Sequence, residues 1–122
     1  MNYAINDYIR RTADMDWLPL SEPGIDTRGI FFKPLRKEPD SGRPVSFILR
    51  FDPGASYPYH SHPEGEEILV LAGSCHIEGA TLKEGDYLYT PAGFRHGVTS
   101  EGGCVLFLMV PAEVEIINPN QV

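Results

Sequence analysis

Short apolar stretches, bounded by glycine, proline or charged residues, follow one another along the chain from Arg28 onward. Stretches of this length between turn residues are typical of strands. Strands are predicted over residues 29–35, 44–51, 66–72, 75–78, 86–90, 94–99, 104–110 and 113–117. Their close spacing favours an all-β sandwich or small barrel.

Residues 1–27 contain the one stretch in which we expect a helix, near residues 7–13, although its apolar spacing is poor. The rest of this segment has no strand or helix pattern. We therefore expect an N-terminal extension over residues 1–27 that packs on a β-domain over residues 28–122.

Two of the predicted strands are apolar on both faces, at residues 68–71 and 105–110. A strand of a barrel or sandwich lines the interior with one face only. Its other face must be covered by a second sheet layer or by a second subunit. Either arrangement would cover these faces.

The amino-acid composition disfavours some kinds of binding partner. The 122 residues make one domain, and 10 basic against 17 acidic residues give a net charge of −7. This charge disfavours nucleic acids and anionic membrane surfaces. No apolar run is long enough to span a bilayer, and the N-terminus lacks a secretory pattern. We expect a cytoplasmic protein in which Cys75 and Cys104 are buried, reduced thiols.

Three histidines and one glutamate form a spaced constellation that could hold a metal ion. In an extended strand His60 and His62 point to the same face. A turn over residues 63–65 could return Glu66 to the same centre, and a turn over residues 91–93 presents His96 from a neighbouring strand. Such a set suits Fe(II), Mn(II), Zn(II), Ni(II) or Cu(II) and leaves one or two positions open in a five- or six-coordinate ion.

Two sequence blocks resemble the two motifs of the cupin superfamily: Gly54…His60-Ser-His62…Glu66…Gly73 and Gly85-Asp86…Pro91-Ala-Gly93…His96. Glu67 is the alternative acidic ligand, but the interval to Gly73 favours Glu66. Ser100 departs from the pattern, because many cupins carry Asn there. A closer resemblance, to ChrR-like cupins, rests on Met15-Asp16-Trp17, Pro23-Gly24, Phe51-Asp-Pro-Gly-Ala55 and residues 60–73.

The resemblance implies a single-domain cupin β-barrel, a jelly-roll-like double sheet with little helix. It also implies one divalent metal ion (Fe, Zn, Mn or Ni) held by His60, His62, Glu66 and His96, and a homodimer. We expect a mononuclear non-haem, dioxygenase-like enzyme that acts on a small ketone, diketone or phenolic substrate. A zinc-binding sensor module without catalysis is an alternative, and a metal-assisted isomerase or lyase is another.

Side chains from strands expected near the metal are candidates for a substrate pocket or for structural packing: Tyr57, Tyr87, Tyr89, Phe107 and Met109. Arg50 and Arg95 could anchor an acidic substrate or lie in solvent. His76 lies outside both motifs, and we expect it at the surface or at an interface.

Overall fold

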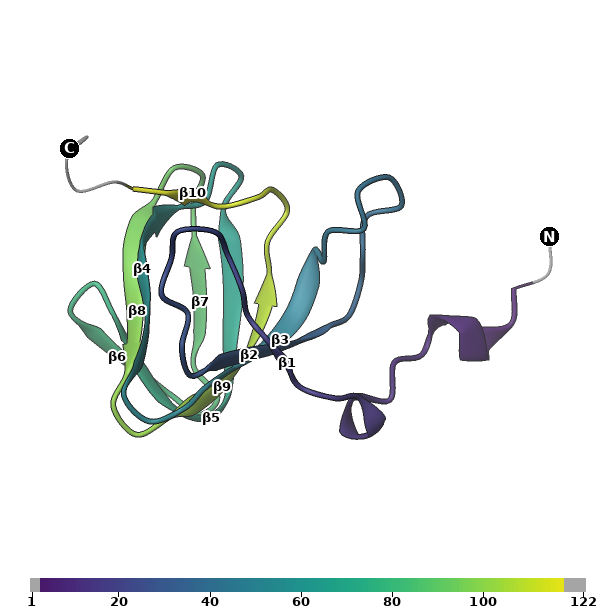
Figure 1. The fold of residues 1–122 in the computed structure, drawn as a ribbon, viewed down its shortest axis with the longest axis horizontal. Coiled ribbons are helices and arrows are strands. Elements are labelled where there is room, and N and C mark those ends of the chain that lie inside the picture. Colours follow the sequence, from purple (N-terminus) through teal and green to yellow (C-terminus); the bar gives the residue numbers. More distant parts are fainter. Residues whose placement is uncertain (1–2, 118–122) are drawn as a thin grey trace.

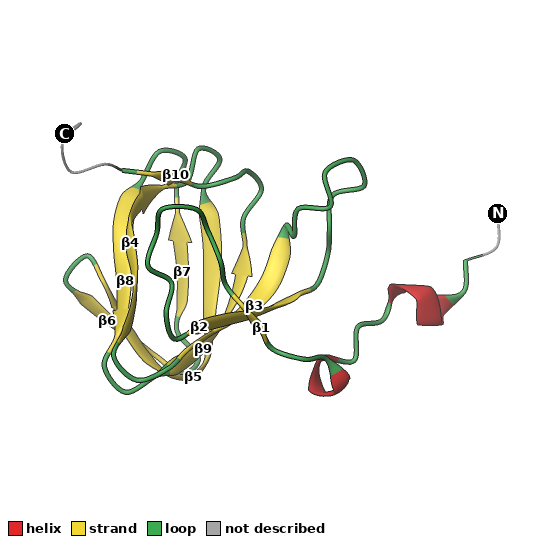
Figure 2. Cartoon of the chain, in the orientation of Figure 1, coloured by secondary structure: helices red, strands yellow, loops and turns green. Residues whose placement is uncertain are grey.

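Antiparallel strands make up most of the chain. A computed structural model describes residues 3–117 (Figures 1 and 2). The strands are β1 (Leu18–Pro19), β2 (Ile30–Pro34), β3 (Ser46–Phe51), β4 (Ala55–Ser61), β5 (Glu66–Ile77), β6 (Ala80–Lys83), β7 (Tyr87–Thr90), β8 (Arg95–Ser100), β9 (Cys104–Met109) and β10 (Glu115–Ile116). The all-β fold expected from the sequence is confirmed.

The strands form one curled sheet in the order β1-β2-β3-β9-β5-β8-β4-β10, with β6 and β7 also paired to β5 (Figure 1). The long strand β5 joins the two halves of this sheet. Its first part pairs with β7 and β9, and its last part pairs with β6 and β8. The concave side of the sheet is therefore enclosed by strands from both halves.

Alternation along β9 shows how the core is built. Cys104, Leu106 and Leu108 are buried, whereas the residues between them are only partly buried. Leu106 and Leu108 pair with Val70 and Ile68 of β5, which are also buried. Because side chains alternate between the faces of a strand, these residues fill the concave side and their neighbours form the convex side.

The structure corrects the predicted boundaries. Residues 66–72 and 75–78 were predicted as separate strands, yet β5 is continuous because Gly73 stays in the ladder opposite Cys104. β1, β4 and β6 were missed by the strand prediction. In β4 the residues Tyr57-Pro58-Tyr59 weaken the usual pattern, and a register shift lies between Tyr57 and His60.

The predicted helix near residues 7–13 is wrong. The chain instead forms two 3-10 turns, η1 (Ile5–Tyr8) and η2 (Thr12–Asp14), and neither buries a side chain (Figure 2). The short β1 already pairs with β2, so the first 27 residues contribute a strand to the sheet. The division at residues 27 and 28 stays a prediction.

Among residues 3–117 no helix has the length and apolar character needed to cross a bilayer. Cys75 and Cys104 are buried free thiols, as expected. The hydrogen bond between the two thiols, together with burial, raises the pKa of Cys75. The cytoplasmic location stays a prediction.

Candidate metal centre

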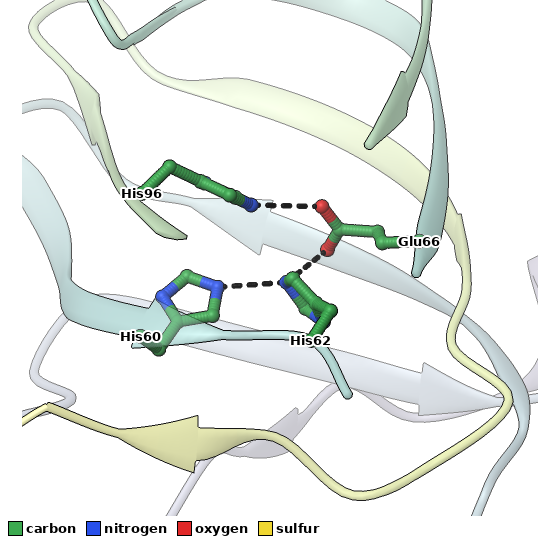
Figure 3. A group of neighbouring side chains, drawn as sticks. All are labelled: His60, His62, Glu66 and His96. Carbon is green, nitrogen blue, oxygen red and sulfur yellow. Dashed lines mark hydrogen bonds and ion pairs between the residues drawn. The ribbon is translucent and has the colours of Figure 1, made fainter. Parts of the chain in front are cut away.

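Three elements bring the four predicted ligands together on the concave side of the sheet (Figure 3). His60 lies on β4 directly opposite His96 on β8, because the two are register partners. His62 follows the end of β4, and Glu66 begins β5. All four are nearly inaccessible, with exposed fractions of 0 to 3%. Four titratable side chains buried side by side need hydrogen-bond partners or a bound ion.

A tight turn sets the distance between His62 and Glu66. The backbone N–H groups of Gly65 and Gly93 both donate to the carbonyl of His62, at 3.1 and 2.8 Å. Gly65 has φ +83°, and a Cβ there would lie 2.8 Å from the carbonyl oxygen of Thr90. Only glycine meets both conditions without strain. The turn therefore fixes where the carboxylate stands relative to the imidazole.

The donor atoms have the spacing of ligands around one ion. His60 Nε2 lies 2.9 Å from His62 Nε2. The two oxygens of Glu66 lie 3.0 Å from His62 Nε2 and 3.1 Å from His96 Nε2. One donor atom from each residue can be chosen so that all four lie within 4.8 Å of one another.

A simple estimate tests the fit. With bonds of about 2.1 Å, neighbouring ligands of a six-coordinate ion lie about 3.0 Å apart, and those of a tetrahedral ion about 3.4 Å apart. The three observed separations fit the six-coordinate case better. Two imidazole nitrogens face each other at 2.9 Å, so at most one proton lies between them, and a cation in its place could be bound by both lone pairs. The buried cluster therefore fits a metal site.

Hydrogen bonds prepare the ligands for a cation. The Nδ1–H of His60 donates to the carbonyl of Pro58 at 2.7 Å, which leaves the lone pair of Nε2 facing the cluster. Burial lowers the pKa of His60 to about 4, so the ring is neutral at pH 7. Nδ1 of His62 is buried and has no hydrogen-bond partner within residues 3–117.

The charged group of the cluster is Glu66. Burial raises the pKa of this carboxyl, but hydrogen bonds from His62 and His96 outweigh burial and lower it. For His96 burial lowers the pKa, while the hydrogen bond to Glu66 raises it and prevails. The carboxylate therefore offers a negative charge to a cation, and His96 is the ligand from which a proton must be displaced.

A cavity of about 610 Å³ opens beside His60, His62 and Glu66. Its other walls are mostly apolar and include Phe32, Phe47, Leu49, Leu106 and Leu108. The loop between β1 and β2 closes one side with Leu20, Glu22 and Ile25. The cavity has the size and character of a small-molecule site.

Tyr57 and Glu22 form a polar pair in this cavity. The Tyr57 hydroxyl donates to the Glu22 carboxylate, with O–O distances of 2.8 and 2.9 Å. The Tyr57 ring packs edge-on against His60, with centroids 4.8 Å apart. Burial and the hydrogen bond to Glu22 raise the pKa of Tyr57, which stays protonated. Sequence reasoning missed Glu22, because nothing in a loop glutamate signals that the loop folds over the cavity.

Of the five predicted pocket residues, the structure brings only Tyr57 to the cavity. Tyr87 and Tyr89 pair with Leu69 and Glu67 on the convex side and are 58% and 57% exposed. Phe107 and Met109 also face that side, because they alternate with the buried Leu106 and Leu108. A residue on a strand near the metal does not necessarily line the cavity, since every second residue of these strands points away from it.

The remaining candidates have structural surroundings. Glu67 faces outward and accepts a hydrogen bond from Tyr87, as the preference for Glu66 implied. Arg50 stacks on Trp17 and Phe31, and Arg95 is exposed. His76 is exposed beside Thr81, at 2.9 Å. Ser100 is buried and donates to the carbonyl of Ser74, so its role is structural.

Comparison with known families assigns the chain to one of them. The sequence model of the family described as the ChrR cupin-like domain matches residues 6–112, which is most of the chain. The chain belongs to the ChrR cupin-like family. The matched residues 6–112 include all four residues of the buried cluster.

Two curated proteins are similar to this ChrR cupin-like domain. The (R)-mandelonitrile lyase of Granulicella tundricola is 31% identical over 75 residues, which cover 57% of each chain. The DNA damage-repair/toleration protein DRT102 of Arabidopsis thaliana is 41% identical over 61 residues, or 45% of this chain and 20% of that protein. The similarity thus spans only part of either relative.

Solved structures share the fold. An acetylacetone dioxygenase from Acinetobacter johnsonii has a TM-score of 0.77 at 20% identity, covering 98% of this chain and 83% of that one. The anti-sigma factor ChrR of Rhodobacter sphaeroides, in complex with SigE, has a TM-score of 0.65 at 23% identity, covering 85% of this chain and 53% of that one. At these identities the likeness is one of fold.

Proposed function

We propose that this protein is a mononuclear, metal-dependent enzyme of the non-haem dioxygenase kind, with a small ketone, diketone or phenol as substrate. The observation that carries the proposal is the buried set His60, His62, Glu66 and His96 beside a mostly apolar cavity of about 610 Å³. The fold shared with an acetylacetone dioxygenase supports it. The metal is one divalent ion, with Fe, Zn, Mn and Ni as candidates.

A divalent ion at this site would supply Lewis-acid activation of a substrate oxygen and a place for dioxygen beside it. The chain contributes the remaining functions. Four side chains supply neutral imidazoles and one carboxylate, and the apolar walls of the cavity keep water away from the reacting groups.

The charges around the cavity favour a neutral substrate. Glu22, Glu66 and Glu113 all line it, so a carboxylate substrate would be repelled. Arg43 also lines the cavity, but Glu38 and the carbonyls of Val110 and Pro111 occupy its guanidinium. No other lysine or arginine among residues 3–117 lines this cavity. Ketones and phenols meet these conditions better than acids do.

Tyr57 and Glu22 orient the substrate in this proposal. The Glu22 carboxylate can accept a hydrogen bond from an enol or phenol hydroxyl, in addition to the one from Tyr57. An acceptor at this place favours the enol form of a diketone. Tyr57→Phe removes the hydroxyl and keeps the ring on His60. It should raise KM by a larger factor than the factor by which it lowers the metal content.

The test has two stages. Elemental analysis of protein purified without chelators gives the metal content, with about one ion per chain expected. Anaerobic reconstitution with Fe(II) is then followed by oxygen uptake over a panel of ketones, diketones and phenols. Uptake should exceed that of free Fe(II), should be lost in His96→Gln, and should persist in His76→Gln. Uptake no greater than that of free Fe(II) over the whole panel would contradict the oxygenase proposal.

Two other functions have a specific observation behind them. Similarity to (R)-mandelonitrile lyase favours metal-assisted lyase chemistry in the same cavity, which product analysis in the absence of oxygen would reveal. The fold shared with ChrR, solved in complex with SigE, favours a zinc-binding sensor. In pull-down experiments a sensor would bind a different set of proteins with metal than without it. Identical sets in the two states would exclude that role.

We also propose that the protein is a homodimer. The convex side of the sheet carries Leu69, Tyr87 and Tyr89, all exposed, and no described part of the chain covers them. Exposed apolar side chains gathered on one face are typical of contact surfaces in soluble proteins. A second copy is the partner that the chain itself supplies.

A further inference from the structure

The N-terminal segment projects from the barrel with apolar side chains in solvent. We call residues 3–14 the arm; they contain the turns η1 and η2 and run away from the sheet (Figure 1). Tyr3, Ile5 and Tyr8 are 69, 71 and 62% exposed. An isolated arm would gain nothing from holding three large apolar side chains in water.

The base of the arm is fixed to the convex side. Lys33, only 8% exposed, donates from Nζ to the carbonyl of Thr12 at 2.6 Å. The Trp17 ring lies 4.5 Å from Lys33 Nζ and 4.9 Å from the Arg50 guanidinium carbon. These contacts hold the stretch from Thr12 to Trp17 against β2 and β3. The arm therefore leaves the sheet from a fixed point.

An apolar row begins next to this anchor. Lys33 pairs with Ile48, Ile48 with Phe107, Phe107 with Leu69, and Leu69 with Tyr87. Direct partners on adjacent strands share a face, so the last four form one row across β3, β9, β5 and β7. Three spacings of about 4.8 Å make this row about 14 Å wide. At about 3.3 Å per residue the free residues 3–11 can reach up to about 30 Å, enough to cross it.

In one copy the arm is exposed, and the row is exposed at Leu69 and Tyr87 and half-buried at Ile48 and Phe107. Both surfaces are apolar, so each can cover the other. The arm points away from its own row, so the contact is available between copies. Two copies related by a twofold axis would bury both surfaces twice in one closed contact. A different protein bound to the row would leave the arm in solvent.

We propose that two copies of this chain associate through their convex sides and exchange arms, so that Ile5 and Tyr8 of each copy pack on the apolar row of the other. This inference rests on the proposed homodimer and adds the arm as its clamp. It is independent of the metal chemistry.

Sedimentation of the full chain tests the clamp. Ile5→Asp should raise the dimer dissociation constant at least tenfold, whereas Asn6→Asp adds the same charge one residue away and should change it less than about twofold. Equal effects of the two variants, or no effect of either, would overturn the exchange while leaving the dimer. A full chain that sediments as a monomer would overturn both.

Cross-linking tests where the arm lies. A photoreactive phenylalanine analogue in place of Tyr8 is activated in an equal mixture of unlabelled and isotope-labelled chains. Exchange predicts cross-links between labelled and unlabelled peptides, at residues 48, 69, 87 or 107. Cross-links confined to peptides of one isotope composition, in a protein that sediments as a dimer, would overturn the exchange.

Discussion

At the residue scale, Glu66 and Glu67 are neighbours in sequence with opposite surroundings. Glu66 is buried between two imidazoles, and Glu67 is on the convex side with Tyr87. Glu66→Gln should weaken metal binding by at least about 10- to 100-fold, since even losing a partner of a ligand costs that much. Glu67→Gln should leave it unchanged. Calorimetric titration with Zn(II) or Mn(II) measures both, and equal affinities for the two variants would exclude Glu66 as a ligand.

The pH dependence of metal binding follows from His96. Its pKa is raised by Glu66, so a metal must displace a proton from it as the pH falls through that value. His60, with a pKa lowered to about 4, adds no competition above pH 5. Affinity should therefore fall about tenfold per pH unit below the pKa of His96. Titrations between pH 5 and 8 measure the slope. His76→Gln should reproduce it, and a flat profile would contradict the prediction.

At the scale of elements, the turn from His62 to Glu66 decides whether the ligands meet. Gly65→Ala would place an L residue at φ +83° and a Cβ 2.8 Å from a backbone carbonyl. It should lower the free energy of unfolding by more than about 2 kcal/mol and reduce metal content. Gly102 has open space around it and no left-handed backbone, so Gly102→Ala should stay within about 0.5 kcal/mol. Denaturant unfolding compares them, and equal stabilities would contradict the role of the turn.

The same elements show how far sequence reasoning reaches. Period-two alternation predicts that Ile68 and Val70 share the inward face of Glu66, and the structure buries all three. Phe107 and Met109, candidates for the pocket or for packing, face outward by the same alternation, because Leu106 and Leu108 hold the inward positions. Glu22 could not be found in this way, because its place depends on how a loop between β1 and β2 folds over the barrel.

At the scale of the whole molecule, the donor set links metal binding to folding. The cluster joins β4, β5 and β8, so an ion held there binds the folded chain and not the unfolded one. Free metal at 100 times its dissociation constant should stabilise the fold by about 2.7 kcal/mol and raise Tm by about 10 °C. Thermal unfolding with metal and with chelator measures this. His62→Gln should lose the shift, and a shift of the same size in that variant would place the ion elsewhere.

X-ray absorption at the metal edge of the loaded protein tests the central claim most directly, since it counts the atoms bound to the ion. The four-residue set predicts three imidazole ligands, at least one carboxylate oxygen and no sulfur, with an unchanged spectrum in His76→Gln. A spectrum with a sulfur ligand, or with fewer than two imidazoles, would contradict the assignment of the site to His60, His62, Glu66 and His96.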